Sequence, residues 1–456
     1  MYELKVGAGI ACINPPMELL PFPGYENYQF EGILSDLRVR AVLLDNGSKR
    51  YLFLAVDAGS TPENELKEEI CKKYGLEKEC LCAVSTHNHS SPFWGVTVLP
   101  GNDSALKLDK QLKYRGVVIR GIYDAIDQAV ASLRPAKYGF GEGKSYISTN
   151  RDSLFEDGYW MQGQNYAGFS DKTLAVMKFE DMDGKLIAAI VNYACHATTA
   201  FCTLDTDGKG KMSSGFPGIA CDFVEERYGD GAVVLWCSGA AGNQNPLFSS
   251  EGFPRIYEQD GYSESFPTPP GTQFMIQRNH GQVHALDIIR TLRSIPCVHP
   301  RMRIVTGSNI VELQGQRAPE GVDMQMNRLF VDNFVRKYHP ELFEHGNKPE
   351  KKLVDMIPCG VVPLHLQLAI LGDVAWVGMG AEPYNQIGVK CKEASPFRNT
   401  VVVTHTESFE TAAGYILDDS SAHHKVFQSY SKVRPGNNDQ PIVDGMLEMF
   451  DQTING

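Results

Sequence analysis

Short apolar runs rich in β-branched residues alternate along the chain with longer segments of helical periodicity. Such runs predict strands where polar or turn-forming residues bound them, and apolar residues recurring every three or four positions predict helices. The predicted strands cover residues 38–44, 51–56, 80–84, 186–193 and 232–237, and the clearest helices cover 62–74 and 111–133. This alternation favours an α/β fold built from layered sheets and helices.

Several predicted strands end directly on polar or small residues. Asp57 follows one strand, His87 follows the next, and His196 follows the strand that runs to Cys195. Gly-rich residues 238–242 follow a fourth strand. Because ligands bind at the carboxyl ends of strands in open α/β sheets, we expect the functional site at those ends.

The segment Thr86-His87-Asn88-His89-Ser90 is typical of a metal site. Side chains alternate with a period of two in a strand, so His87 and His89 are expected to project the same way from its end. Two neutral imidazoles suit zinc, which prefers nitrogen, sulfur and carboxylate ligands in a tetrahedron. The spacing also fits two polar residues in a turn, so further ligands are required elsewhere.

We expect one catalytic unit over residues 1–456, because the 456-residue chain shows no internal repeat and no clean linker. A softer subdivision is predicted near residues 296–300, where the strand-like segment 302–311 begins after a helix. Residues 249–272 are rich in Gly, Pro and Ser and predict a long loop. Loops of this length are often lids or binding loops, although an inert surface excursion fits equally well.

Charge and hydropathy narrow the function classes. The chain has 43 basic and 55 acidic residues, a formal charge of −12, and no block of Lys and Arg, so nucleic acid is not an expected partner. No apolar stretch is long enough to span a bilayer, and the chain opens without a secretion signal. We expect a soluble, cytoplasmic protein with a small-molecule substrate, barring a trimmed leader; the oligomeric state stays open.

The 11 cysteines occur without close Cys-x-x-Cys pairs, and many fall inside apolar strands. They are expected to be reduced, buried thiols. The pair Cys80-x-Cys82 remains an alternative metal-binding motif near His87.

Two later segments add candidate ligands, Glu382 just past the apolar run 374–379 and Tyr415 after the predicted strand 400–404. With them, the sequence resembles the neutral/alkaline (non-lysosomal) ceramidase family. The matching motifs follow the family's order through most of the chain: Val6-Gly7-Ala8-Gly9-Ile10, Asn14-Pro15-Pro16, Gly24-Tyr25, residues 37–41, Val56-Asp57, residues 86–90, Asn150-Arg151, the His196 segment, residues 239–246, Glu382 and Gly414-Tyr415.

The resemblance implies a site and an activity. It implies Zn²⁺ held by a set of four ligands: His87, His196, Glu382 and Tyr415. It also implies that His89 and Arg151 act on the substrate, while a zinc-activated water attacks the carbonyl of an N-acyl amide. In chemical terms, Arg151 or a protonated His89 can stabilise the oxyanion, and Glu382 or His89 can move the proton to the leaving amine.

The sequence is compatible with two roles for Asp57, and it does not favour either of them. Asp57 can orient a ligand histidine through the free ring N–H of that histidine. It can equally be a residue that closes a strand and begins the turn at Gly59-Ser60-Thr61.

The departures from the family pattern concern the substrate. The family's Gly-Asp-x-Ser-Pro-Asn reads Gly242-Asn243-Gln244-Asn245-Pro246-Leu247 here, which makes Asn243 and Asn245 candidate substrate-binding residues. After Tyr415 a threonine pair and a further tyrosine are missing, and His423 or His424 is the candidate replacement for that phenol. No C-terminal β-sandwich domain is apparent, and no amphipathic helix predicts membrane contact. We therefore expect a substrate other than ceramide, smaller or more polar.

Other readings remain open. A metal-dependent hydrolase of an ester or glycoside would use the same generic groups, and an amidohydrolase barrel would add His280 and His405 as later strand-end histidines. A metal-stabilised binding protein without turnover would fit the altered residues. A dinucleotide-binding loop at Val6-Gly7-Ala8-Gly9-Ile10 fits poorly, because it lacks a third glycine and Pro15-Pro16 follows.

Overall fold

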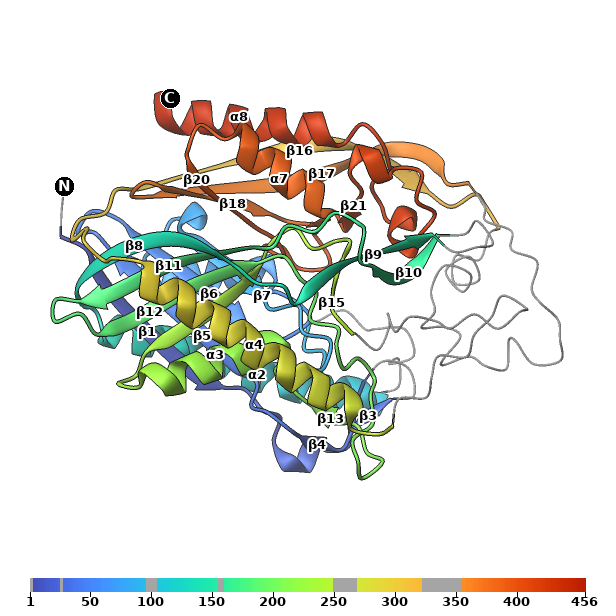
Figure 1. Cartoon of the computed structure of the whole chain (residues 1–456), viewed down its shortest axis with the longest axis horizontal. Coiled ribbons are helices and arrows are strands. Elements are labelled where there is room, and N and C mark those ends of the chain that lie inside the picture. The colour runs from blue at the N-terminus through green and yellow to red at the C-terminus, as the bar shows by residue number, and fades with distance from the viewer. Residues whose placement is uncertain (1–2, 25–27, 96–104, 155–159, 249–268, 322–354) are drawn as a thin grey trace.

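The largest sheet of the computed structural model has eight strands in the order β14-β12-β11-β8-β1-β5-β6-β7 (Figure 1). The structure describes residues 3–24, 28–95, 105–154, 160–248, 269–321 and 355–456. The strands of this sheet are β1 (Lys5–Cys12), β5 (Arg38–Asp45), β6 (Arg50–Val56), β7 (Leu81–Ser85), β8 (Arg134–Lys144), β11 (Thr173–Asp181), β12 (Leu186–Tyr193) and β14 (Val233–Ser238). Neighbouring strands are antiparallel except for the two outer pairs, β6 with β7 and β12 with β14, which are parallel.

The sheet folds back on itself, so that β14 lies against β5 and β6. The main core fills the space between the two halves, with Phe53 and Val84 from one half and Ile190 and Leu235 from the other. Strands buried on both faces need apolar residues at nearly every position. This explains why the strands read as continuous apolar runs in the sequence.

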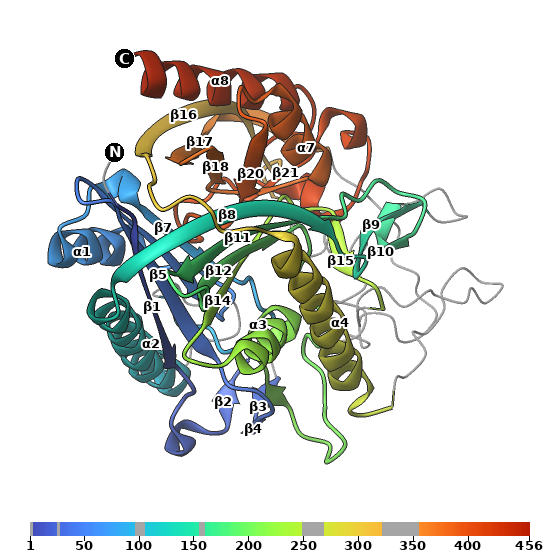
Figure 2. The same cartoon turned by 60° about the vertical axis from the view of Figure 1, so that its left-hand side comes forward.

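Helices cover both outer faces of the folded sheet (Figure 2). On one side lie α1 (Asn64–Tyr74) and α2 (Ala105–Ala131), and on the other lie α3 (Gly215–Tyr228) and α4 (Thr272–Ser294). Helix α2 packs so closely on β1 that a Cβ at Gly7 or Gly9 would lie 1.9 or 2.1 Å from a helix carbonyl oxygen. The glycine pair therefore serves helix packing, which removes the main reason for a dinucleotide-binding reading.

A second sheet of four strands, in the order β16-β17-β18-β20, forms the upper part of Figure 1. Its strands are β16 (Ile304–Arg317), β17 (Ile357–Leu371), β18 (Val374–Met379) and β20 (Asn399–Val403), and it packs against α8 (Asp439–Asn455) and α7 (Asn385–Ala394). Trp376 and Val401 reach from this sheet into the main core, where the Trp376 ring lies 5.2 Å from that of Phe53. The second sheet thus begins just after residues 296–300 and shares a core with the first.

Short strands outside the two large sheets carry much of the candidate site. They are β2 (Phe22–Pro23) with β3 (Gln29–Phe30), β4 (Gly32–Ile33) with β13 (Lys211–Met212), β9 (Ser148–Leu154) with β10 (Trp160–Asn165) and β15 (Gln244–Pro246), and β19 (Glu382–Pro383) with β21 (Tyr415–Ile416). Turns of 3-10 helix occur at Met17–Leu19, Lys78–Cys80, Asp419–Ser421 and Phe427–Tyr430.

The α/β class and the predicted elements are confirmed. Each of the five predicted strands named first differs from the observed one by at most one residue at either end, and the predicted helix 111–133 corresponds to α2, which begins earlier, at Ala105. Most of the predicted loop 249–272 lies outside the described residues. None of the 11 cysteines forms a disulfide within the described part of the chain, and Cys82 belongs to the main core. Within the described part of the chain, no helix is long and apolar enough to cross a membrane.

Candidate metal centre

Four short segments converge to bring His87, His196, Glu382 and Tyr415 together. His87 follows β7 and His196 follows β12, and a parallel bridge between Asn88 and Ala197 joins the two strand ends. Glu382 and Tyr415 are paired Cα partners in β19 and β21. A hydrogen bond of 2.9 Å from the Gly242 N–H to the carbonyl oxygen of Pro383 links the Gly-rich segment 238–242 to the short strand that carries Glu382.

The separations between donor atoms in this group fit one tetrahedral ion. Glu382 Oε2 lies 3.5 Å from His87 Nε2 and 3.1 Å from His196 Nε2, and Tyr415 Oη lies 3.4 Å from the same nitrogen of His196. Ligands held about 2.0–2.1 Å from a tetrahedral zinc lie roughly 3.3 Å from one another. The donor set therefore has the spacing and the chemistry of a divalent metal site.

Backbone carbonyls orient the two histidines of this set. The Nδ1 of His87 bonds to the carbonyl oxygen of Gly59 at 3.1 Å, and the Nδ1 of His196 bonds to that of Ala241 at 2.6 Å. Each Nδ1 must carry the proton, because a carbonyl oxygen only accepts. Each Nε2 is therefore left with its lone pair directed at the centre, which is the tautomer a metal ligand requires.

The reading of Asp57 as the residue that orients a ligand histidine is wrong. Its carboxylate accepts hydrogen bonds from the guanidinium of Arg40 at 3.0 Å and from the Arg38 N–H at 3.1 Å. Burial raises the pKa of Asp57 to about 6, against the opposing effect of Arg40. The carbonyl of Gly59, two residues further along, takes the position predicted for this carboxylate.

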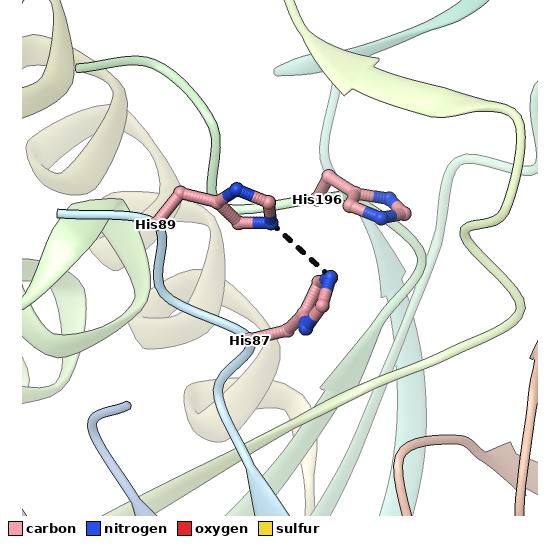
Figure 3. Close-up of side chains that lie close together, drawn as sticks. All are labelled: His87, His89 and His196. Carbon is pink, nitrogen blue, oxygen red and sulfur yellow. Dashed lines mark hydrogen bonds between the residues drawn. The ribbon is translucent and has the colours of Figure 1, made fainter. Parts of the chain in front are cut away.

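His89 lies at the edge of the same group (Figure 3). Its Nε2 is 3.2 Å from the Nε2 of His87, the two rings are nearly perpendicular, and the side chain is partly exposed. One ring nitrogen from each of His87, His89 and His196 lies within 4.8 Å of the other two. The geometry therefore places His89 within reach of both a bound ion and a molecule approaching from solvent.

His405 also belongs to this centre, although the sequence brought it forward only under the amidohydrolase alternative. Its ring stacks on that of His87, with centroids 4.0 Å apart and an angle of 17° between the planes. The signal that could have found it is the one that found His87 and His196, because His405 comes almost directly after β20. The barrel reading itself is wrong, since the sheets are folded layers and His280 lies on α4, 3.5 Å from Thr199.

Burial and mutual repulsion keep these imidazoles neutral. Burial lowers the pKa of His87, His89, His196 and His405. Neighbouring imidazoles lower it further at all of these except His87, where Glu382 opposes the shift. Burial alone would raise the pKa of Glu382, but His87, His405 and a hydrogen bond with Tyr415 hold it below its ordinary value. A carboxylate among neutral imidazoles is a set ready to bind a cation.

Arg151 stands behind the ligand set and supplies a buried positive charge. Its guanidinium donates to the carbonyl oxygen of Gly242 at 2.6 and 3.0 Å and to Asn245 Oδ1 at 3.2 Å, and it lies 5.5 Å from the ring centroid of Tyr415. It also shares a hydrogen bond with the Tyr415 side chain. The charge of Arg151 therefore acts on Tyr415 and also directly on His196, whose pKa it lowers.

The two asparagines predicted to bind substrate hold the site together instead. Asn245 Oδ1 accepts from Arg151 and, at 3.2 Å, from the hydroxyl of Thr198. Asn243 accepts from the Asn385 N–H at 3.0 Å through its side chain and from the Arg151 N–H at 2.9 Å through its carbonyl. Both side chains are almost fully buried. They fix the positions of neighbouring loops, and amides suit this task because they donate and accept.

His424 is bound to the residue that follows Arg151, and His423 is exposed. His424 Nδ1 lies 2.8 Å from Asp152 Oδ2, and its ring stacks on Trp160 with centroids 3.6 Å apart. Asp152 also accepts from the hydroxyl of Tyr384 at 3.2 Å. Asp152 of β9 and His424, which follows the turn Asp419–Ser421, therefore form a polar pair outside the donor set.

Comparison with known proteins agrees with this architecture. Residues 4–230 match the family model described as neutral/alkaline non-lysosomal ceramidase, N-terminal. The chain is 28% identical over 260 residues to neutral ceramidase of Drosophila melanogaster and 25% identical over 230 residues to neutral ceramidase B of Dictyostelium discoideum. These matches cover 53% and 46% of this chain but only 36% and 31% of the relatives, so the chain spans about a third of their length.

The fold is that of a solved ceramidase. The crystal structure of neutral ceramidase from Pseudomonas aeruginosa superposes with a TM-score of 0.67 at 17% identity, covering 100% of this chain and 74% of that one. A ceramidase complexed with C2 gives the same TM-score at 18% identity. The family-model match over residues 4–230 places the chain in the neutral/alkaline non-lysosomal ceramidase family, and the superpositions show the shared fold.

Proposed function

We propose that this protein is a zinc-dependent hydrolase of an N-acyl amide. The observation that carries the proposal is the tetrahedral spacing of His87, His196 and Glu382, with Tyr415 beside them. Imidazole nitrogen and carboxylate oxygen are favoured zinc ligands, and a set of three with a fourth position for water is typical of catalytic sites. When bound, zinc supplies Lewis-acid activation and lowers the pKa of a coordinated water to roughly 7.

The surrounding residues divide the remaining work. Water adds its oxygen to the acyl carbon as His89 Nε2 accepts its proton, because the neutral, partly exposed imidazole lies on the open side of the cluster. The C–N bond then breaks as the same proton passes to the leaving nitrogen, giving an amine and a carboxylic acid that loses its remaining proton to the solvent. Arg151 contributes a fixed positive charge that favours the oxyanion and holds the Tyr415 hydroxyl in place.

We further propose that the substrate is smaller or more polar than ceramide. Phe201 lies 5.4 Å from the ring of His89, and Phe427 lies 5.4 Å from the ring of Tyr415, which together provide apolar contact for an acyl group. Near Arg151, however, the chain carries the polar pair of His424 and Asp152 in the region where the family resemblance led us to expect a tyrosine. A polar amine portion suits such a pair.

The test is amine release by the full chain, stripped of metal by a chelator and then restored with Zn²⁺. The panel comprises short N-acyl amino acids, short-chain N-acylsphingosine, long-chain ceramide and matched esters. We expect zinc-dependent release from a short or polar amide, and a loss of about 10²–10⁴-fold in His89→Gln with zinc retained. His299→Ala, at an exposed position, is the matched control. If the zinc-restored protein cleaves none of the amides in the panel, the proposal is contradicted.

A further inference from the structure

The stacking of His405 on His87 bears on where a second cation would lie. An imidazole binds a metal in its ring plane, along the nitrogen lone pair. With centroids 4.0 Å apart and an angle of only 17° between the planes, the two lone pairs lie in separate, nearly parallel planes. They cannot both meet one ion at about 2.0–2.1 Å, the normal distance from zinc to a histidine nitrogen. His405 is therefore not a further ligand of the ion that His87 faces.

Two parallel imidazoles at this spacing match a pair of ions instead. Metals in two-metal sites lie about 3.5–4 Å apart, which is close to the separation of the two rings. A nitrogen of each ring and a carboxylate oxygen of Glu382 all lie within 4.8 Å of one another. Oε2 of Glu382 faces His87 and His196, and a carboxylate has a second oxygen that can bind a neighbouring cation.

A small pocket adjoins His405 and Glu382. The side chains of Ser60, Ser85 and Glu407 also line it. The hydroxyl oxygens of Ser60 and Ser85 are buried and have no hydrogen-bond partner among the described residues, and both residues are at least nine-tenths buried. Buried hydroxyls without partners are costly, so two of them in one pocket point to water or a hydrated cation there.

The backbone at His405 is held in an unusual conformation. Its φ of 55° lies in the left-handed region, which costs a residue other than glycine free energy. The Thr61 hydroxyl donates to the His405 carbonyl oxygen at 2.5 Å and helps fix this turn. Such strain persists where the surrounding structure imposes it, and it is common at functional sites. The imidazole is thereby held against His87.

We propose that His405 and Glu382 hold a second divalent cation beside the first, with waters bonded to Ser60 and Ser85 completing its coordination. This inference rests on the proposed metal centre, because Glu382 would bridge the two ions. With few protein ligands, the second ion binds more weakly than the first. Its place beside the catalytic ion suits a clamp on the substrate carbonyl oxygen or on the product carboxylate.

The test counts metal ions on the full chain after chelator treatment. Isothermal titration with ZnCl₂, together with elemental analysis after gel filtration at saturating zinc, is expected to give two equivalents per chain, one tight and one weaker. His405→Gly removes the imidazole and adopts a positive φ readily, so it should retain only the tight equivalent, with its Kd within about threefold of wild type. His299→Ala should retain both equivalents.

A second readout uses Mn²⁺, because two adjacent Mn²⁺ ions couple magnetically. The wild type should give a coupled-pair electron paramagnetic resonance signal, and His405→Gly only the signal of an isolated ion. If His405→Gly does not fold by circular dichroism, His405→Asn serves instead, because Asn tolerates the left-handed region. One equivalent in wild type, or two equivalents in His405→Gly, would overturn the second site while sparing the metal centre. No bound metal in wild type would overturn both.

Discussion

Glu382 and Tyr415 are register partners in the short parallel pairing of β19 with β21. The two residues are far apart in the sequence, yet this pairing sets their Cα atoms side by side. Hydrogen bonds from the Glu382 N–H to the Gly414 carbonyl oxygen and from the Tyr384 N–H to the Ile416 carbonyl oxygen, both 2.9 Å, hold the register. The carboxylate and the phenol thus reach the centre as one unit.

Tyr415→Phe should weaken zinc binding by about 10–100-fold without unfolding the protein. The change removes a hydroxyl that lies 3.4 Å from His196 Nε2 and is hydrogen-bonded to Glu382, so it costs either a direct ligand or a partner that orients two of them. Competition with a chromogenic chelator measures the affinity. Copper substitution separates the two roles, since only a coordinated phenolate gives a tyrosinate-to-copper absorption band that Tyr415→Phe abolishes. Unchanged affinity in the variant would exclude both roles.

Removing His87 and removing His89 should have different effects. His87→Gly should abolish tight zinc binding, because it deletes a central donor, and glycine suits the φ of 51° at this position. His89→Gln should retain zinc and lose turnover. Elemental analysis of both variants after identical reconstitution checks this division. Loss of zinc in His89→Gln would instead assign His89 to the metal, in keeping with the set formed by His87, His89 and His196.

Asn245→Ala should destabilise the protein by about 1–3 kcal/mol, because it leaves the buried Arg151 guanidinium and the Thr198 hydroxyl without a shared acceptor. Asn245→Asp retains an acceptor oxygen and is the matched control, expected to lie closer to wild type. Guanidinium denaturation of the metal-free proteins measures the difference. Equal stability of Asn245→Ala and wild type would show that the amide contributes nothing to holding Arg151.

Acid should destabilise the metal-free protein as the pH falls below about 6.5. Burial lowers the pKa of His284 to about 3 and that of His280 to about 4. At any pH between these folded-state values and the ordinary histidine pKa of 6.5, the unfolded chain therefore binds more protons than the folded protein. Stability is therefore present above pH 6.5 and is lost as the pH falls. His284 alone contributes a slope of roughly 1.4 kcal/mol per pH unit. The raised pKa of Asp57 acts in the opposite direction between about pH 4 and 6, and the two histidines outweigh it.

His284→Gln tests that assignment. Trp236 donates its indole N–H to His284 Nε2 at 3.2 Å, and His284 Nδ1 lies 2.9 Å from the Ser145 hydroxyl, so a protonated ring would lose its acceptor. A glutamine amide can accept and donate at the same position but does not titrate near neutrality. Denaturation midpoints from pH 4.5 to 7.5 should fall less steeply in the variant. An identical pH dependence would remove His284 as a cause.

Gly9→Ala should destabilise the protein by about 3 kcal/mol, because the added Cβ would lie 2.1 Å from the carbonyl oxygen of Ala125 and would push α2 away from β1. Gly116→Ala, within α2 itself, is the control. Its Cβ meets only Arg120 Nη1 at 3.8 Å, so it should raise stability by roughly 0.5–1 kcal/mol. Thermal unfolding of the two variants compares them directly. Comparable stability of Gly9→Ala and wild type would contradict the close packing.

The sequence by itself determined the strands, their ends and the chemistry placed there. Apolar runs identified β5, β6, β7, β12 and β14, because strands buried on both faces need apolar residues throughout. His87 and His196 were recognisable because each stands just beyond such a run. Glu382 and Tyr415 required the family resemblance, since a two-residue strand has no periodicity to read.

Only the tertiary structure decided which polar groups meet. Asp57 and Gly59 are two residues apart, yet Asp57 pairs with Arg40 and Gly59 orients His87, and no local pattern distinguishes these outcomes. In the sequence His405 is one of several residues that follow predicted strands. Only the packing of the second sheet shows that its ring stacks on that of His87. Strand propensity and burial can be predicted from a short stretch of sequence. Which polar side chains contact one another depends on how sheets that are distant in sequence pack together. Most residues of the centre can therefore be predicted from the sequence, whereas their relative positions depend on the tertiary structure.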